Sequence, residues 1–254
     1  MSQPLKISII TIAFNSAETI EDTINSVISQ DYPHIEYIVV DGKSTDGTVA
    51  IINKYTNSIT KFISEKDKGL YDALNKGIKL STGDIVGILH SDDLFFDNQV
   101  ISKVEKAFSE NNIDSLYANL IFVDRFNISN TKRVWRAGVY HKGAFRRGWM
   151  PPHPTFFVKT KLFQKLGFYR TDLRFSADYE LMLRFIHKNN VSTYYLNEFI
   201  VKMRLGGISN TDILSKLKAH KEDKIAWQVN NMKSSTWWLW MKPLGKISQF
   251  FKRQ

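Results

Sequence analysis

The chain has 254 residues, of which 43% are hydrophobic and 24% are charged, the proportions of an ordinary globular protein, so collagen-like, low-complexity and wholly disordered chains are excluded. It contains no cysteine, which excludes disulfides and thiolate chemistry, and no apolar run approaches the roughly 18–20 residues that span a bilayer or resembles a signal peptide, so we expect a cytoplasmic protein. The formal net charge of +10 predicts an anionic partner, without identifying it.

The first predicted unit is a strand, a loop and a helix. Residues 5–13 form a nearly continuous apolar, β-branched run, which is typical of a strand buried on both faces. Asn15, with Glu18 three positions later, resembles a capping box, and apolar residues then recur at helical spacing until Pro33. We therefore expect a helix that opens at Asn15.

The same alternation continues through the first half of the chain. Further strands are predicted at 35–40, 60–64 and 84–90, and further helices at 48–55, 69–80 and 97–110. Strands that alternate with helices form βαβ crossovers. We therefore expect an α/β fold with a Rossmann-like, mainly parallel sheet flanked by helices.

The second half has a different character. Strand-like segments lie at 115–124, 132–140 and 192–203, and helical spacing is found at 159–166, 177–188 and 211–229. Because the first two of these strands surround a polar turn, we expect a mixed extension of the sheet here. The chain ends in an aromatic and basic stretch at 236–254.

Polar side chains follow three of the predicted strands, at the edge where an open parallel sheet binds ligands. Asn15 follows the first strand, Asp41 the second, and Asp92 and Asp93 the strand that ends at His90. The Asp41 carboxylate can accept two hydrogen bonds, as from a pyrimidine imide or ribose hydroxyls. Two adjacent carboxylates repel each other, and a bound cation relieves that cost. The alternative is that these residues only form polar turns and helix caps.

Four motifs stand in register along this part of the chain: Thr11-x-x-x-Asn15, Asp41-Gly-x-Ser-x-Asp-Gly-Thr48, Lys68-Gly-Leu-Tyr-Asp-Ala-Leu-Asn-Lys-Gly77 and Ser91-Asp-Asp93. In this order and spacing, the chain resembles family 2 glycosyltransferases of the GT-A fold over about residues 5–205. The resemblance implies transfer of a sugar from a nucleotide diphosphate sugar, with inversion at the anomeric carbon. A UDP-linked hexosyl or N-acetylhexosaminyl donor is expected.

The resemblance also divides the chain. It implies a glycosyltransferase domain at 1–208, with a nucleotide-sugar half at about 1–125 and an acceptor half at about 126–208. A helical, amphipathic C-terminal tail is expected at 209–254.

The resemblance further assigns residues to the donor site. It implies that Thr11, Asn15 and Lys68 belong to the nucleotide-sugar site, that Asp41 holds the nucleotide base, and that Asp92 holds the ribose or the sugar.

The metal site follows from the last motif. The resemblance implies that Asp93 binds a Mg²⁺ or Mn²⁺ ion that bridges the diphosphate. The Asp-x-Asp motif of the family stands here as Ser91-Asp92-Asp93, so its first acid is replaced by serine. Such an ion would neutralise the charge that develops on the leaving nucleoside diphosphate.

Transfer also needs a base that takes the proton from the attacking acceptor hydroxyl. The segment Phe175-Ser-Ala-Asp-Tyr-Glu resembles the later acidic motif of the family, so Asp178 is the predicted catalytic base; the alternative is an ordinary carboxylate at a helix start. Glu180 lies two positions further along the helix and points elsewhere, and His153 lies in a proline-rich loop. Both are expected at the acceptor site.

The C-terminal stretch suggests a membrane partner. Its Trp and Phe side chains stand among Lys and Arg, so it either lies in the interface of an anionic membrane or packs its aromatic face on the domain. In the first case the protein is peripheral on the inner face of the membrane. Its acceptor would be a glycan or a lipid-linked molecule in cell-surface polysaccharide biosynthesis.

Two other functions compete with this hypothesis. A sugar nucleotidyltransferase would carry a glycine-rich, basic loop after the first strand, where this chain has Ala13-Phe-Asn-Ser-Ala17. A nucleic-acid binder would fit the isoelectric point of about 9.5. However, Asp41, Asp92 and Asp93 would repel phosphates unless a cation intervened, so we do not expect nucleic acid as a partner.

Overall fold

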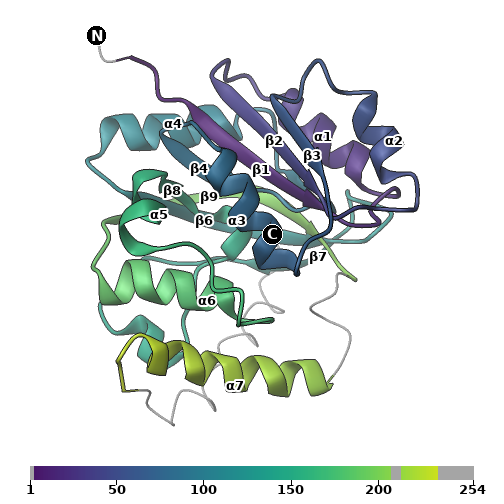
Figure 1. The fold of residues 1–254 in the computed structure, drawn as a ribbon. Coiled ribbons are helices and arrows are strands. Elements are labelled where there is room, and N and C mark those ends of the chain that lie inside the picture. The colour runs from purple at the N-terminus through teal and green to yellow at the C-terminus, as the bar shows by residue number, and fades with distance from the viewer. Residues whose placement is uncertain (1–2, 207–212, 234–254) are drawn as a thin grey trace.

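The computed structural model describes residues 3–206 and 213–233 (Figure 1). Within this part, one nine-stranded sheet runs through the molecule, with helices on both of its faces. The strand order is β3-β2-β1-β4-β8-β6-β9-β5, and β7 pairs with β6 outside this path. The α/β architecture predicted from the sequence is confirmed.

The first half consists of parallel strands joined by helices. Its elements are β1 (Ile7–Ala13), α1 (Ile20–Ile28), β2 (Ile35–Asp41), α2 (Thr48–Asn53), β3 (Lys61–Ser64), α3 (Leu70–Leu80) and β4 (Ile85–Ile88). All of the pairings among β1, β2, β3 and β4 are parallel. The carboxyl ends of these strands therefore meet at one edge of the sheet, where the predicted donor site lies.

The predicted helix start at Asn15 is wrong. Helix α1 begins at Ile20, with Thr19 at its N-cap. Asn15 has a left-handed backbone (φ 48°), which asparagine tolerates better than most residues. Its side-chain oxygen accepts a hydrogen bond from the Thr45 amide at 2.9 Å, so it joins two loops and does not cap a helix.

The second half is the mixed extension that the sequence predicts. Its strands and α-helices are β5 (Asp93–Phe95), α4 (Val100–Glu110), β6 (Ser115–Val123), β7 (Thr131–Trp135), β8 (Phe157–Lys159), α5 (Lys161–Leu166), α6 (Ala177–Met182), β9 (Thr193–Arg204) and α7 (Ile213–Val229). Three further helical segments are the 3₁₀ turns η1 (Ala144–Arg147) and η2 (His153–Thr155) and the π-helix η3 (Leu183–Lys188). Strands β7 and β8 are antiparallel to β6, whereas β9 is parallel to it.

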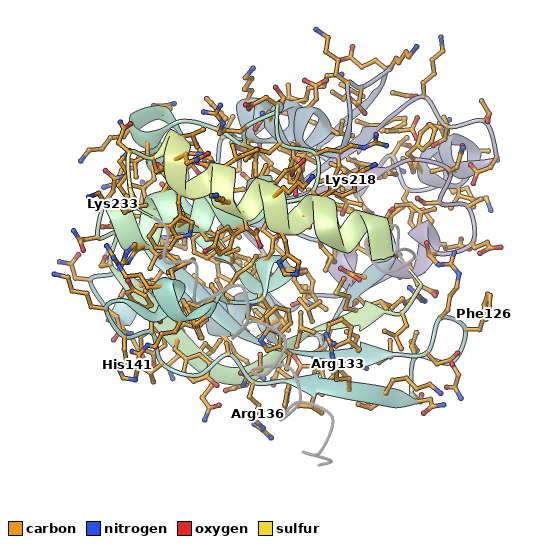
Figure 2. The ribbon with its side chains drawn as sticks, turned by 90° about the horizontal axis from the view of Figure 1, so that it is seen from below. Phe126, Arg133, Arg136, His141, Lys218 and Lys233 are labelled. Atoms are coloured by element: carbon orange, nitrogen blue, oxygen red, sulfur yellow. The ribbon has the colours of Figure 1, made fainter. Side chains whose placement is uncertain are left out.

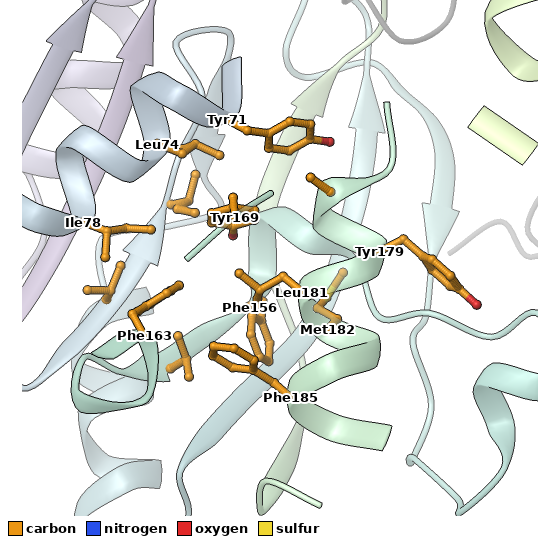
Figure 3. Packing of buried hydrophobic residues seen from close by; sticks show 14 of the residues in the cluster. Tyr71, Leu74, Ile78, Phe156, Phe163, Tyr169, Tyr179, Leu181, Met182 and Phe185 are labelled. Carbon is orange, nitrogen blue, oxygen red and sulfur yellow. The ribbon is translucent and has the colours of Figure 1, made fainter. Parts of the chain in front are cut away.

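Two hydrophobic cores cover the two faces of the sheet. One contains α1, α2 and α4, and the other contains α3, α5, α6 and α7. Figure 3 shows the second core, where Tyr71, Leu74 and Ile78 of α3 pack toward the helix that begins with α6. A Cβ atom at Gly77 would lie 2.4 Å from Cγ2 of Ile10. Glycine at this position of the third motif therefore lets α3 pack closely on β1.

Helix α7 belongs to this second core. Ala226 and Trp227 are fully buried in it, so the first helix of the predicted C-terminal tail packs on the domain. The aromatic and basic stretch at 236–254 lies outside the described residues. Within the part that the structure describes, no helix has the length and hydropathy to cross a membrane.

Candidate active site

Hydrogen bonds join the loops at the carboxyl ends of β1, β2 and β4. The Asn15 amide donates to Ser44 Oγ at 2.8 Å, which links the loop after β1 to the loop after β2. The hydroxyl groups of Ser16 and Ser91 lie 2.8 Å apart, which links the loop after β1 to the loop after β4. The segments that carry Asn15, Asp41 and Asp92 thus form one continuous edge.

Asp41 lies under this edge. Its side chain is fully buried, and its carboxylate accepts hydrogen bonds from the Ser44 amide at 3.0 Å, from Ser64 Oγ at 2.6 Å and from the Ser44 hydroxyl. These donors satisfy the buried charge without a ligand. The contact of Asp41 with a nucleotide base stays a prediction. For Asp41 to bind a base, hydrogen bonds from the base would have to replace part of those that Ser44 donates to it.

An exposed aromatic ring, which sequence analysis missed, lies beside Asp41. Phe14 follows β1 directly and is 62% exposed. A Cβ atom at Gly42 would lie 3.2 Å from the Phe14 ring and 3.0 Å from Asp67 Oδ2. Glycine therefore keeps the space between Phe14 and Asp67 open. A large apolar residue directly after a buried strand, where a polar turn is expected, was the available signal.

The two adjacent carboxylates have different environments. Asp93 is the first residue of β5 and is only 1% exposed, and within the described residues neither of its carboxylate oxygens has a hydrogen-bond partner. Burial, and after it the charge of Asp92, raises the pKa of Asp93 well above its usual range, although Arg204 opposes this shift. Asp92 is partly exposed, so it is the member of the pair that a ligand can reach.

The fit of this edge to a divalent cation is incomplete. The described residues contain no group of three or more His, Asp or Glu side chains arranged to hold a metal ion. Mg²⁺ is typically held by one or two carboxylates together with substrate phosphates. Asp92 can provide such a carboxylate because it is partly exposed. The Asp93 carboxylate is enclosed and could provide one only if the protein opened around it.

Arg204, at the end of β9, holds the Asp92 backbone in place. Its side chain is 3% exposed and donates to the carbonyl oxygens of Asp92 at 3.1 Å and Arg125 at 2.9 Å, and it forms an ion pair with Asp22 of α1. It therefore connects the second half of the chain to the edge formed by the loops after β1, β2 and β4, which we call the donor edge because the donor site is predicted there. Sequence analysis missed this role, because nothing local marks a contact between residues 112 positions apart.

The predicted base is in contact with helix α3. Asp178 is the second residue of α6 and is partly exposed. The Tyr71 hydroxyl donates to Asp178 Oδ1 at 3.3 Å, and the Tyr71 ring stacks on Tyr169 with 5.7 Å between centroids. Tyr71 belongs to the third motif, so this motif reaches from the donor edge to Asp178.

Helix α7 fixes the start of α6. The Glu222 carboxylate accepts hydrogen bonds from the backbone amides of Arg174, Phe175 and Ser176, at distances of 2.7–3.0 Å. These amides lie at or just before the first turn of α6, where a carboxylate also interacts favourably with the helix dipole. Glu222 therefore restrains the backbone that carries Asp178.

Glu180 does not face a site open to an acceptor. It is 1% exposed, and its carboxylate accepts hydrogen bonds from Arg184 at 2.9 Å and from Asn230 at 2.8 Å. Arg184 in turn donates to the carbonyl oxygens of residues 166–168. Glu180 therefore links α6 to α7 and to the turn after α5, which is a positioning role.

His153 is also enclosed. It is 7% exposed, and its Nε2 atom lies 2.7 Å from the Tyr169 hydroxyl. Burial lowers the pKa of His153 to about 4, so the ring is neutral near pH 7. Its neighbour His90, 5.9 Å away between ring centroids, has a pKa lowered to about 4 by burial and then by His153.

The two remaining predicted donor-site residues lie in different places. Thr11 is fully buried within β1, and its hydroxyl accepts a hydrogen bond from Tyr37 at 3.1 Å; it supports the strand beneath the edge. Lys68 is exposed just before α3, and its backbone amide donates to Asp72 at 3.0 Å. Lys68 is therefore accessible to a ligand, and Thr11 is not.

Comparisons with known proteins agree with these observations. The family model described as Glycosyl transferase family 2 matches residues 8–175. An uncharacterized glycosyltransferase of Mycobacterium tuberculosis is 33% identical over 192 residues, which cover 72% of this chain and 70% of that protein.

Solved structures of two proteins show a similar fold. S. aureus TarS superposes with a TM-score of 0.67 at 19% identity, and the match covers 90% of this chain but only 41% of TarS. The TarS fragment 1–349 in complex with UDP superposes with a TM-score of 0.65 at 18% identity, and the match covers 90% of this chain and 67% of the fragment. A mannosyltransferase from Pyrobaculum calidifontis, in complex with GDP-Man and Mn²⁺, gives 0.63 at 17% identity over 100% of this chain and 77% of that one. The fold is therefore of the GT-A type.

Proposed function

The chain belongs to glycosyl transferase family 2, and on this premise we propose that it transfers a sugar from a UDP-linked donor to a hydroxyl group of a glycan or lipid-linked acceptor, with inversion. The observation that carries the proposal is the contact between Tyr71 and Asp178. It brings the candidate base to the helix that begins beside the donor edge. The UDP complex of TarS supports the choice of nucleotide.

The donor would lie along the edge formed by the loops after β1, β2 and β4. The exposed Phe14 ring offers a stacking surface for the base, with Asp41 beneath it as a hydrogen-bond acceptor. Asn15 shapes this edge through its bonds to Ser44 and Thr45, and Lys68 is an exposed cation for the diphosphate.

The partly exposed Asp92 carboxylate would hold a Mg²⁺ or Mn²⁺ ion together with the diphosphate, as the Mn²⁺ complex of the Pyrobaculum mannosyltransferase suggests. Such an ion, when bound, neutralises charge on the leaving group. The sequence predicts Asp93 as the metal ligand. We instead give this role to Asp92, because the Asp93 carboxylate is enclosed behind it. The Arg204 bond to the Asp92 carbonyl keeps this segment in place.

Asp178 would accept the proton of the acceptor hydroxyl as that oxygen attacks the anomeric carbon. The reaction joins the acceptor oxygen to the sugar, breaks the bond to the nucleoside diphosphate and leaves the proton on Asp178. The Tyr71 hydroxyl orients the carboxylate through Oδ1. Glu180 and His153 act behind this site, through Arg184 and Tyr169 respectively.

Thermal unfolding with a panel of nucleotide diphosphates and nucleotide sugars tests the donor site, because a ligand that binds only the native state raises the midpoint. We expect UDP and one UDP-sugar to raise the midpoint, and Mn²⁺ to increase that shift. The variant Asp92→Asn should lose the effect of Mn²⁺. A response to no nucleotide, with or without the ion, would contradict the proposal.

A peripheral location at an anionic membrane completes the proposal. It would bring the protein to lipid-linked acceptors of cell-surface polysaccharide biosynthesis. The net charge of +10 supports it, as do the aromatic and basic residues at 236–254.

A further inference from the structure

The middle of the chain carries charge of one sign only. Residues 125–171 contain eleven Lys and Arg side chains and neither Asp nor Glu. A run of this length without an acidic residue gives a surface that repels cations and attracts anionic partners. The segment includes β7 and the loop that follows it, which extends to η1.

Several of these cations lie on one surface around β7. We define the β7 surface by exposed or partly exposed side chains on the turn before β7, on β7 and on the loop after it: Arg125, Phe126, Lys132, Arg133, Arg136, Val139, His141 and Lys142. Figure 2 shows Phe126, Arg133, Arg136 and His141 on the face seen from below, with Lys218 of α7 on the same side. Strand β7 pairs only with the end of β6 in the described sheet, so its other edge is not hydrogen-bonded to a described strand.

Large apolar side chains are exposed in the same segments. Phe126, in the turn between β6 and β7, is 82% exposed, the largest exposure among the large hydrophobic residues of the described chain, and Val139 is 62% exposed. Each is next to, or within three residues of, a basic side chain. Exposed apolar groups beside cations are the combination that inserts at the headgroup level of an anionic bilayer.

Two cations of the β7 surface, Arg136 and Lys142, are available to a partner. Arg125 and Lys132 pair with Glu18 and Asp124, respectively. In contrast, Arg136 and Lys142 form no ion pair with any described residue. The Arg136 guanidinium lies 4.8 Å from the centroid of the Phe199 ring, which holds it on the surface without neutralising it.

From these observations we propose that the β7 surface docks on an anionic lipid membrane. The basic side chains would meet the phosphates of the headgroups, and Phe126 and Val139 would enter the interface. The two apolar anchors favour a bilayer over nucleic acid, which would use the charge but leave no place for Val139.

The β7 surface is connected to the donor edge. Arg204 donates both to the carbonyl of Arg125, beside Phe126, and to the carbonyl of Asp92. Docking would therefore set the distance of the active site from the membrane. The docking assigns a surface to the membrane location in the proposed function and rests on that part of it, whereas sugar transfer is tested separately.

Vesicle flotation of the full chain tests the docking, with phosphatidylcholine vesicles and with vesicles that contain about 30% phosphatidylglycerol at about 0.1 M salt. Each basic residue near an anionic surface contributes about a fivefold change in partitioning, so Arg136→Glu/Lys142→Glu should bind at least about 30-fold more weakly. Phe126→Ser should bind about fivefold more weakly. Neither the double variant nor Phe126→Ser should alter UDP binding, so failure of docking is distinguishable from failure of the proposed function.

The matched control is Lys161→Glu/Lys165→Glu, which makes the same change of charge at two exposed positions of α5 in the same acid-free segment. We expect it to bind the anionic vesicles within about threefold of the unmodified chain. Equal losses in the two double variants, flotation that survives Arg136→Glu/Lys142→Glu, or binding to RNA but not to the vesicles would each overturn the proposal.

Discussion

The two halves of the molecule differ in charge and in the way they are built. Residues 1–124 contain 18 acidic and 10 basic side chains, whereas residues 125–254 contain 7 acidic and 25 basic ones. The acidic part contains the parallel strands β1 to β4, and it ends with β6. Strand β6 pairs with three strands of the basic part, of which β7 and β8 run antiparallel to it and β9 runs parallel.

In the proposed function, this difference separates the two tasks of a transferase. The acidic half would provide hydrogen-bond acceptors for a donor and a carboxylate for a cation. The basic half would provide the candidate base, Asp178, and the surface proposed to face the membrane. The contacts of Tyr71 with Asp178, and of Arg204 with Asp92, cross between them.

The largest expected effect is a loss of stability when the buried ion pair between Glu180 and Arg184 in the second half is broken. In Glu180→Ala, Arg184 loses its carboxylate partner, and breaking a buried pair costs about 3–5 kcal/mol. Urea unfolding measures this loss. The control is Glu198→Ala, which removes the exposed partner of Lys103 and should cost less than about 1 kcal/mol. Equal costs would show that the second half does not depend on the Glu180 network.

The first half should show its own dependence on pH. Although burial alone raises the pKa of Glu36, hydrogen bonds from Ser8 and Thr82 lower it from 4.5 to about 2. A lowered pKa stabilises the fold above pH 4.5, and this stability is lost as the pH falls from 4.5 toward 2. The contribution is about 3 kcal/mol.

Urea unfolding of the unmodified chain and of Glu36→Gln across that pH range measures the contribution. The unmodified chain should be the more stable one at neutral pH, and the difference should shrink as Glu36 is protonated. Parallel curves for the two proteins would contradict the assignment.

The link through Arg204 should affect the donor rather than the chemical step. Arg204→Met removes the bonds to the Asp92 and Arg125 carbonyls, so we expect the KM for the donor to rise about tenfold, or about 1.4 kcal/mol, with kcat nearly unchanged. Arg204→Lys keeps the charge beside Asp22 and should recover part of the loss. Steady-state kinetics measure both variants, and an unchanged KM in Arg204→Met would disprove the link.

The link through Tyr71 should have the smallest effect and the opposite kinetic signature. Tyr71→Phe removes the hydrogen bond to Asp178 but keeps the stacked ring. We expect kcat to fall about fivefold, which corresponds to about 1 kcal/mol, with the donor KM unchanged. The control is Tyr32→Phe, whose hydroxyl bonds to the Leu5 carbonyl outside the site. A fall in kcat that is equal in both variants would remove the special role of Tyr71.

The sequence predicted the first half well because its structure is local. Apolar runs and helical spacing identified β1, β2 and α3. The polar residues after three of the strands were the basis for predicting a donor site at their carboxyl ends, which the hydrogen bonds among these loops join into one edge. The start of α1 was misplaced because Asn15 satisfies the Thr45 amide of a neighbouring loop, and this contact leaves no local trace. Strands β5 and β8 have three residues each, too few to show a period.

Prediction was weaker at the site and in the second half because partners there are distant in sequence. The spacing of Glu180 and Arg184 on one helix is visible in the sequence, but the carbonyl groups that Arg184 binds are not. The enclosure of His153 by Tyr169 also requires the fold. Phe14 was visible in the loop after the first strand, but no role was assigned to it.

The most direct test of the division between the halves compares Asp178→Asn with the unmodified chain in two measurements on the same sample, UDP-sugar affinity and transfer rate. The account predicts that the rate falls about 10³-fold while the Kd for the donor stays within about twofold of the original value. Loss of donor binding in Asp178→Asn, or a transfer rate within about tenfold of the unmodified chain, would contradict the account.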